Sequence, residues 1–178
     1  MPYNNVNHLA TLVTAAQVKA TLNTANFDSG LITTDIIKIA EITHIEKTIG
    51  RAYYEELVTQ NASSSLTAAN TTLMDNYLIR CLSWFVKFEL LNDLQYQTTG
   101  TGIMQNIDDF SSAVSPKQFD LIKQDCSRKA NLFLQDMLDF ISSETNINNY
   151  ITYKNSNDKD DDAFGDTTAN KQGGIIFY

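Results

Sequence analysis

The sequence has few of the residues that mark metal-binding, membrane-spanning or exported proteins. Its only cysteines, Cys81 and Cys126, and its only histidines, His8 and His44, lack the close spacing of a zinc site. No apolar run approaches the length of a membrane-spanning helix. The N-terminal residues lack a basic segment ahead of an apolar one, so no secretory signal is expected. We therefore expect a soluble protein with two buried, reduced thiols.

Basic residues are also scarce. The 178 residues include 13 lysines and arginines against 21 aspartates and glutamates, giving a formal net charge of −8. The basic residues cluster only in pairs, such as Lys47 with Arg51 and Arg128 with Lys129. Proteins that grip nucleic acid neutralise phosphates with larger basic clusters, so tight binding of DNA or RNA is disfavoured.

Motifs for catalysis are absent as well. The sequence contains no His-Glu-x-x-His, Gly-x-Ser-x-Gly or Ser-x-x-Lys pattern. The glycines around Gly100-Thr101-Gly102 lack the lysine and hydroxyl residue of a phosphate-binding loop. His44 is expected at the surface or its boundary, and Asp136 with Asp139 on a solvated helix face. The sequence therefore predicts neither an enzyme nor a bound metal or cofactor.

What the sequence does contain is helical periodicity. Apolar residues recur every three or four positions from Thr67 to Thr98, and Thr67 suits the N-cap of that helix. Its apolar face widens around Cys81 to Phe88. We expect this central helix to form the core with residues of two further helices, the core residues being Trp84, Phe85, Phe88, Ile49 and Phe133.

Two further long helices flank the central one. The first runs from Thr33 or Thr34 to about Gln60 and includes Gly50, which predicts a bend or a close helix crossing. The other begins at Ser115-Pro116 and ends near Ser142. A short helix over Ala15–Asn23 precedes them.

These elements predict an all-α fold. We expect an antiparallel bundle of three long helices and a short N-terminal helix, with a short extended mid-chain segment at Ile103–Ile107 and an extended C-terminal arm at Asn146–Tyr153. Residues 1–153 would form the helical domain with its N-terminal arm. Residues 154–178 would form an acidic, flexible tail, since residues 158–178 hold five aspartates against two lysines.

The chain ends on a candidate docking peptide. Two glycines precede four consecutive apolar residues, and such a peptide would be an aggregation hazard if it were left in water. Tyrosines of the C-terminal arm could contribute to the same contact. The expected partner-docking residues are Ile175, Ile176, Phe177, Tyr178, Tyr150 and Tyr153.

Four segments taken together resemble a known family. They are IEKTIGRAYYEELV, YLIRCLSWFVKFELL, GIMQNIDDFSSAVSP and NLFLQDMLDFISSETNINNYITY. In this order the pattern resembles the head-to-tail connector proteins of tailed bacteriophages, and most of all those from phages of Bacteroides-type gut bacteria. The acidic linker and the final GGIIFY lie outside the resemblance.

The resemblance implies a structural virion protein made in the host bacterial cytoplasm. Such an adaptor forms a homo-oligomeric ring, twelve-fold by analogy, below the portal protein and joins the next ring or tail protein. It continues the channel for DNA, which is only passing cargo, and it contacts no membrane. The residues leave two alternatives open: a stand-alone helical protein-interaction module, regulatory or chaperone-like, and a helical enzyme without a recognisable motif.

Overall fold

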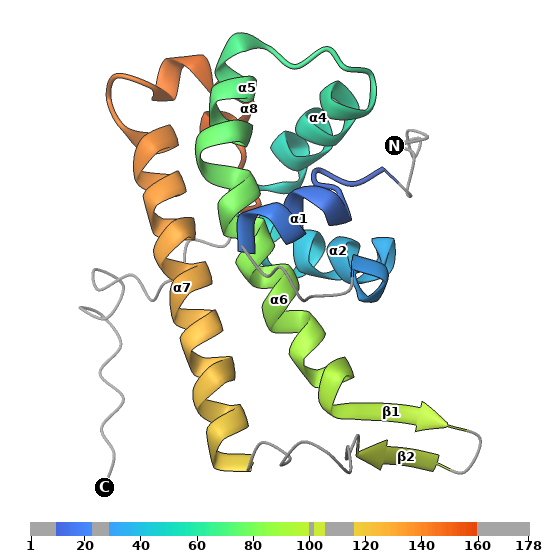
Figure 1. Ribbon diagram of the computed structural model, residues 1–178. Helices are drawn as coiled ribbons and strands as arrows, with labels where there is room; N and C mark the ends of the chain where they lie inside the picture. The colour runs from blue at the N-terminus through green and yellow to red at the C-terminus, as the bar shows by residue number, and fades with distance from the viewer. Residues whose placement is uncertain (1–9, 23–28, 100–101, 106–115, 160–178) are drawn as a thin grey trace, which may run out of the picture.

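The computed structural model of the protein describes residues 10–22, 29–99, 102–105 and 116–159. These residues are mainly helical, as the sequence predicts, and they include one two-stranded sheet (Figure 1).

Helix α1, Ala15–Leu22, follows a buried N-terminal segment. The Thr14 hydroxyl accepts a hydrogen bond from the Gln17 amide, and the Gln17 side chain accepts one from the Thr14 amide. This reciprocal capping explains where the helix begins. Val18 is fully buried, and α1 packs across the long helix α6 (Figure 1).

The helix predicted from Thr33 to Gln60 is divided in two. Helix α2, Thr34–Ala40, passes into the π-helix η2, Glu41–Glu46, and the short α3, Lys47–Ile49. The predicted start at Thr33 or Thr34 is confirmed, and the Thr33 hydroxyl caps the helix by accepting a hydrogen bond from the Ile36 amide. A separate helix, α4, then runs over Arg51–Ala62. The prediction of one continuous helix is therefore wrong.

Gly50 makes the break. Its φ of +83° lies in the region that only glycine adopts without strain, and its ψ is 145°, so the helix cannot continue through it. The break leaves the amide of Arg51 to bond the Asp158 carboxylate at 3.0 Å. The sequence predicts a bend or a close helix crossing at Gly50, whereas the structure has a break between α3 and α4.

The predicted central helix is present. It consists of α5, Ala68–Leu73, the π-helix η3, Met74–Leu78, and α6, Ile79–Gln95. Thr67 caps it as predicted, accepting a hydrogen bond from the Asn70 amide. The helix ends three residues earlier than expected, because the chain turns into a strand at Tyr96.

A β-hairpin follows the central helix. Strand β1, Tyr96–Thr99, pairs antiparallel with β2, Gly102–Gln105, and Tyr96 lies opposite Gln105. The predicted extended segment Ile103–Ile107 is confirmed as far as Gln105, and its last two residues lie outside the described residues.

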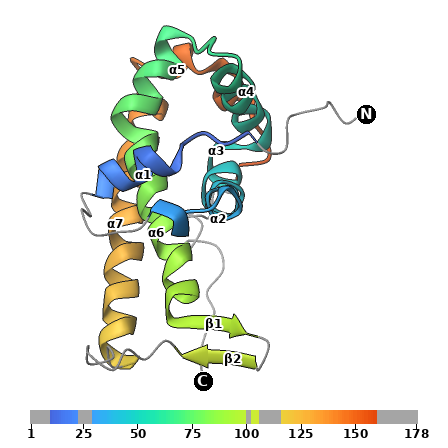
Figure 2. The same cartoon turned by 45° about the vertical axis from the view of Figure 1, so that its right-hand side comes forward.

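Helix α7, Pro116–Ser142, returns antiparallel along α6 and has the bounds that the sequence predicted (Figures 1 and 2). The face toward the core consists of Cys126, Ala130, Leu134, Met137 and Ile141, which are all nearly inaccessible to solvent. The Cys81 thiol on α6 donates to the Ala130 carbonyl at 3.8 Å, so the two helices approach closely here. With the second helix divided, two long helices remain instead of three.

The predicted core residues differ in burial. Ile49 and Phe85 are buried as expected, with 0% and 3% of their surface exposed. Trp84, Phe88 and Phe133 are only partly buried. The ammonium groups of Lys87 and Lys129 lie 5.1 and 4.7 Å from the Trp84 ring centroid. The indole thus packs on the core and presents its remaining surface to cations.

The C-terminal arm is not extended where the structure describes it. Residues Ile147–Asn149 form the 3₁₀ helix η4, and Ile151–Asn155 form α8. Tyr150 and Tyr153 are buried against the ring of Tyr53, at centroid distances of 6.2 and 6.0 Å. The domain boundary expected after Tyr153 therefore falls inside a packed helix.

Candidate functional site

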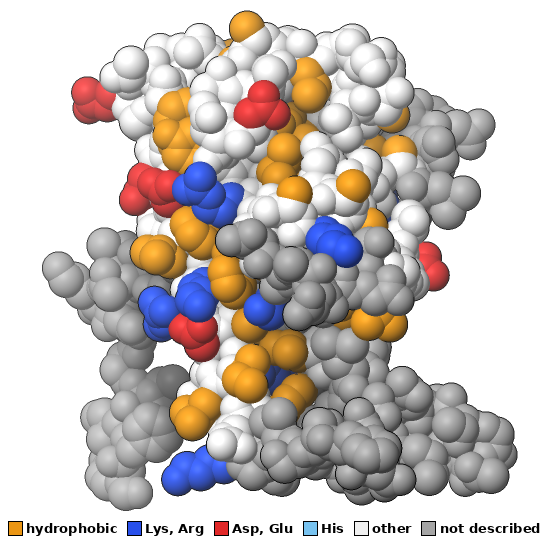
Figure 3. Space-filling view, in the orientation of Figure 1, with side chains coloured by type: hydrophobic (Ala, Val, Ile, Leu, Met, Phe, Trp, Pro, Cys, Tyr) orange, Lys and Arg blue, Asp and Glu red, His pale blue; other side chains and the backbone are white. Residues whose placement is uncertain are grey.

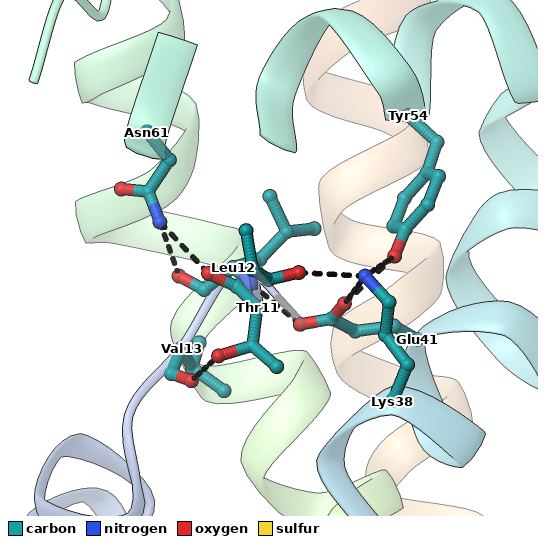
Figure 4. A network of polar contacts seen from close by, with 8 residues as sticks. Thr11, Leu12, Val13, Lys38, Glu41, Tyr54 and Asn61 are labelled. Carbon is teal, nitrogen blue, oxygen red and sulfur yellow. Dashed lines mark hydrogen bonds and ion pairs between the residues drawn. The ribbon is translucent and has the colours of Figure 1, made fainter. Parts of the chain in front are cut away.

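The most buried charged group is Glu41, whose side chain is inaccessible to solvent (Figure 4). Its carboxylate accepts hydrogen bonds from the Leu12 amide at 2.5 Å, the Tyr54 hydroxyl at 2.8 Å and the Lys38 ammonium at 3.3 Å. Lys38 also donates to the Ala10 carbonyl and to the Tyr54 hydroxyl, each at 2.7 Å. Both charges are therefore held by groups of the protein itself.

This network joins three parts of the chain. It links the segment before α1 to η2 and α4, and Asn61 reinforces it by donating to the carbonyls of Thr11 and Leu12 (Figure 4). Burial raises the pKa of Glu41, and the hydrogen bonds from Tyr54 and Leu12 and the charge of Lys38 oppose that rise. A buried carboxyl of raised pKa is a common sign of a catalytic acid. Here its oxygens already accept three internal bonds, so we interpret it as an anchor for the N-terminal segment.

His44 and Glu89 form a second polar contact. His44 Nε2 lies 2.7 Å from Glu89 Oε1, and the two side chains are 21% and 23% exposed. The imidazole stacks on the Phe85 ring at a centroid distance of 4.0 Å. His44 therefore lies at the boundary of the core, where the sequence placed it, and links η2 to α6.

The two cysteines are buried and unpaired, as predicted. Burial raises the pKa of the Cys81 thiol above its usual range, and burial also raises that of Cys126. Both groups therefore disfavour the thiolate form that nucleophilic chemistry requires.

Within the part of the chain that the structure describes, no three His, Cys, Asp or Glu side chains gather as metal ligands would. No helix in the same ranges is long and apolar enough to cross a membrane.

In the described residues, large apolar side chains are exposed in two groups and at the single residue Ile151 of α8 (53%). One group lies around α2, and its members are Leu31 before α2 (43% exposed), Ile39 on α2 (51%) and Ile42 in the following η2 (45%). The other lies on α7 and consists of Leu121 (56%), Ile122 (43%) and Leu132 (59%). Helices α2 and α7 lie on opposite sides of α6 (Figures 1 and 2). The molecule thus has two separate apolar surfaces.

Sequence reasoning did not find these surfaces. The helical periodicity predicts Ile39, Ile42 and Ile122 on the apolar stripes of their helices, but the structure leaves them exposed. The periodicity gives Leu121 and Leu132 no role. The apolar part of each helix is wider than the face it buries. A signal was available for α7, since Leu121 and Leu132 stand three helical turns apart and opposite the buried stripe.

The hairpin β1–β2 is a third candidate for contact. Figure 1 shows that it projects sideways from the end of α6, away from the helical body. In the described residues its sheet has only two strands, so each strand has one edge that this sheet leaves unpaired.

The residues predicted to dock a partner do not come together. Tyr150 and Tyr153 belong to the core of their own chain, and the Tyr150 hydroxyl donates to the Ala69 carbonyl at 3.0 Å. Neither ring is available to a partner, which corrects that prediction. The peptide Ile175–Tyr178 lies outside the described residues.

A sequence profile of a family of unknown function, DUF6712, matches residues 45–163, more than half of the chain. The chain belongs to the DUF6712 family. No curated protein and no solved structure matches it. The DUF6712 region contains α4 to α8, the hairpin and the exposed group on α7. Glu41 and the apolar group near α2 lie before the DUF6712 match.

Proposed function

We propose that the protein is a structural component of a phage virion, a head-to-tail connector that assembles as a ring below the portal. The observation that carries the proposal is the projecting hairpin on a small helical body with apolar surfaces on two sides. A subunit of a closed ring must contact each neighbour through a different surface. An arm and two unlike apolar surfaces meet that requirement.

The hairpin gives an independent reason to expect a binding partner. An isolated two-stranded sheet is only marginally stable in water, and its outer edges present backbone groups that can pair with another strand. Strand addition from an adjoining subunit or connector would satisfy those groups. The proposal includes the acidic C-terminal tail, residues 154–178, with Ile175–Tyr178 as a second docking element.

The charge of the chain suits a conduit for DNA. A formal charge of −8 on each copy would give a ring a strongly acidic surface. Like charges repel across such a channel, so DNA would slide through it without being held.

A stand-alone interaction module is the second candidate. The apolar group near α2, Leu31 with Ile39 and Ile42, could receive an amphipathic helix of a regulatory partner. Such a module would stay monomeric or dimeric in the presence of a portal protein, whereas the connector would not.

Co-assembly with the cognate portal protein tests the proposal. We expect negative-stain images of the mixture to show an additional ring on the portal. A variant in which residues 97–104 are replaced by a short Gly-Ser turn should lose that ring and keep its helical circular dichroism. The variant Ile151→Ser, which removes an exposed apolar side chain from α8, serves as the control. Absence of a ring with the unmodified protein would reject the proposal.

A further inference from the structure

The outer face of α7 includes Leu121 and Leu132, which belong to one of the two apolar surfaces named above, and it also carries an ordered set of charges that the connector proposal does not use. Opposite the buried stripe, residues at spacings of four, three and four share one narrow face: Leu121, Asp125, Arg128 and Leu132. The two leucines are 56% and 59% exposed, more than half of each residue. In Figure 3 this side of the molecule shows basic and acidic side chains midway along the helix, with apolar side chains above and below them.

The order of residues on this face is self-complementary. Along the helix the face has the order leucine, aspartate, arginine, leucine. Each leucine therefore has a charged residue next to it on the inner side, and the two charged residues have opposite signs. The next positions outward are also opposite in sign, since Lys117 precedes Leu121 by four residues and Asp136 follows Leu132 by four. Both of these side chains are exposed. The pattern therefore maps onto itself, with charges exchanged, when the helix direction is reversed.

We propose that this face binds a second copy of the chain, with the two α7 helices antiparallel about a two-fold axis between Asp125 and Arg128. The axis brings Leu121 of one copy against Leu132 of the other at both ends of the contact. Asp125 then faces Arg128, and Lys117 faces Asp136. A two-fold contact uses the same surface twice, which is what a self-complementary face requires.

The charges select the antiparallel arrangement over the parallel one. In a parallel pair in register, Asp125 would face Asp125 and Arg128 would face Arg128, and like charges in contact are strongly disfavoured. Within one copy Asp125 bonds Arg128 at 2.8 Å and Lys129 at 2.6 Å, so charges of both signs lie side by side at the centre of the face. The four charged positions of each face sum to zero, so the faces can approach although each chain is acidic.

The contact is small, because it rests on one helix from each copy. Interfaces at the low end of the size range are weak and reversible, so we expect a pair that forms at protein concentrations of about 100 μM. The pair leaves the hairpin and the apolar group near α2 on the far side of each copy (Figures 1 and 2). The inference does not rest on the connector proposal, and it concerns the isolated chain.

Charge exchange tests the pairing. In analytical ultracentrifugation of the full chain at this concentration, the wild type should sediment as a dimer. Asp125→Arg and Arg128→Asp should each be monomeric, because each places like charges opposite one another twice. An equimolar mixture of the two variants should form a heterodimer, and the double variant should dimerise again. The matched controls Glu55→Arg and Arg51→Asp reverse an exposed ion pair on α4 and should remain dimeric.

Disulfide trapping tests the orientation. Oxidation of a mixture of Leu121→Cys and Leu132→Cys should yield a cross-linked heterodimer. Leu121→Cys alone should cross-link poorly, since its two thiols would lie about 16 Å apart along the axis. The proposal is overturned if the wild type is monomeric, if the single charge variants dimerise like the wild type, or if their mixture stays monomeric. If the wild type and all charge variants instead form the same larger oligomer, the self-contact lies on another surface and the proposal is also overturned.

Discussion

Glu41 is a buried charge whose hydrogen bonds stabilise this fold and whose removal from water opposes folding. Its carboxylate loses all contact with water, which is costly for a charged group. Three donors from three parts of the chain compensate for that loss. Removing the carboxylate would leave the Lys38 ammonium without its charged partner and the Leu12 amide without its acceptor.

We therefore predict that Glu41→Ala lowers the free energy of unfolding by about 3 to 5 kcal/mol at neutral pH, the range for breaking a buried ion pair from one side. Urea denaturation followed by circular dichroism measures the change. Glu55→Ala is the control, because its exposed pair with Arg51 should contribute less than about 1 kcal/mol. A loss of similar size in both variants would show that the Glu41 network contributes no more than a surface pair.

The pH dependence of stability should also report on Glu41. Burial raises its pKa in the folded protein above the ordinary value of 4.5, so the folded state binds the proton more tightly than the unfolded state. This contribution is fully present below the unfolded pKa and is lost as pH rises through the folded pKa. Glu41→Gln cannot titrate, so the stability of the wild type minus that of Glu41→Gln should fall as pH rises above about 4.5. A difference that increases over that range would mean that the hydrogen bonds outweigh burial.

Gly50 determines how the helices of the N-terminal half are connected, because it separates α3 from α4. Helix starts follow from local chemistry, and the caps at Thr33 and Thr67 and the proline at the start of α7 could all be predicted. The break at Gly50 could not, because it depends on a contact with a segment more than a hundred residues later. A β-carbon built on Gly50 would meet Ser156 Oγ at 2.5 Å and Asp158 Oδ1 at 2.9 Å.

The variant Gly50→Ala distinguishes a helix that is broken at Gly50 from one that continues through it. In a helix interior this change would stabilise the protein by about 1 kcal/mol. With a φ of +83° and Ser156 in the way, we expect it to destabilise by about 1 to 3 kcal/mol. Thermal unfolding gives the sign directly. Combining it with Ser156→Gly should recover the part of the loss caused by the contact, whereas a stabilised single variant would indicate a continuous helix.

The C-terminal elements were mispredicted for the same reason as the break. Alternation of apolar and polar residues in Asn146–Tyr153 indicated an extended arm, yet two of its tyrosines pack on Tyr53, far away in the sequence. The apolar period of α2 and α7 identified the helices correctly. It did not show which apolar residues would lack a neighbour, since that depends on which helices are placed against them.

For the whole molecule, the all-α class, the helix starts and the extended mid-chain segment could be predicted from sequence. The apolar group near α2 could not, because the exposed Ile39 differs from core residues only through the tertiary arrangement. The α7 surface could have been recognised, because Leu121 and Leu132 lie opposite the buried stripe of their helix. The docking role of the last residues stays a prediction. The effect of that docking would appear only in an assembly.

Deletion of residues 173–178 should leave the helical circular dichroism unchanged and weaken assembly on the portal by at least about tenfold, since burial of even two such apolar side chains favours binding by several kcal/mol before ordering costs. Titration of portal with the truncated chain measures the loss. Replacing Ile175 and Ile176 by serine in the full-length chain is the matched variant. Undiminished affinity of the truncated chain would show that residues 173–178 do not dock on the assembly.

The central claim is that many copies of this chain form one ring on a portal. Native mass spectrometry of the portal mixed with an excess of the protein tests it most directly. The account predicts a single complex whose mass exceeds that of the portal by a fixed, ring-sized number of chains, with no partly filled species at saturation. A portal mass that is unchanged, or one that increases by only one or two chains, would contradict it.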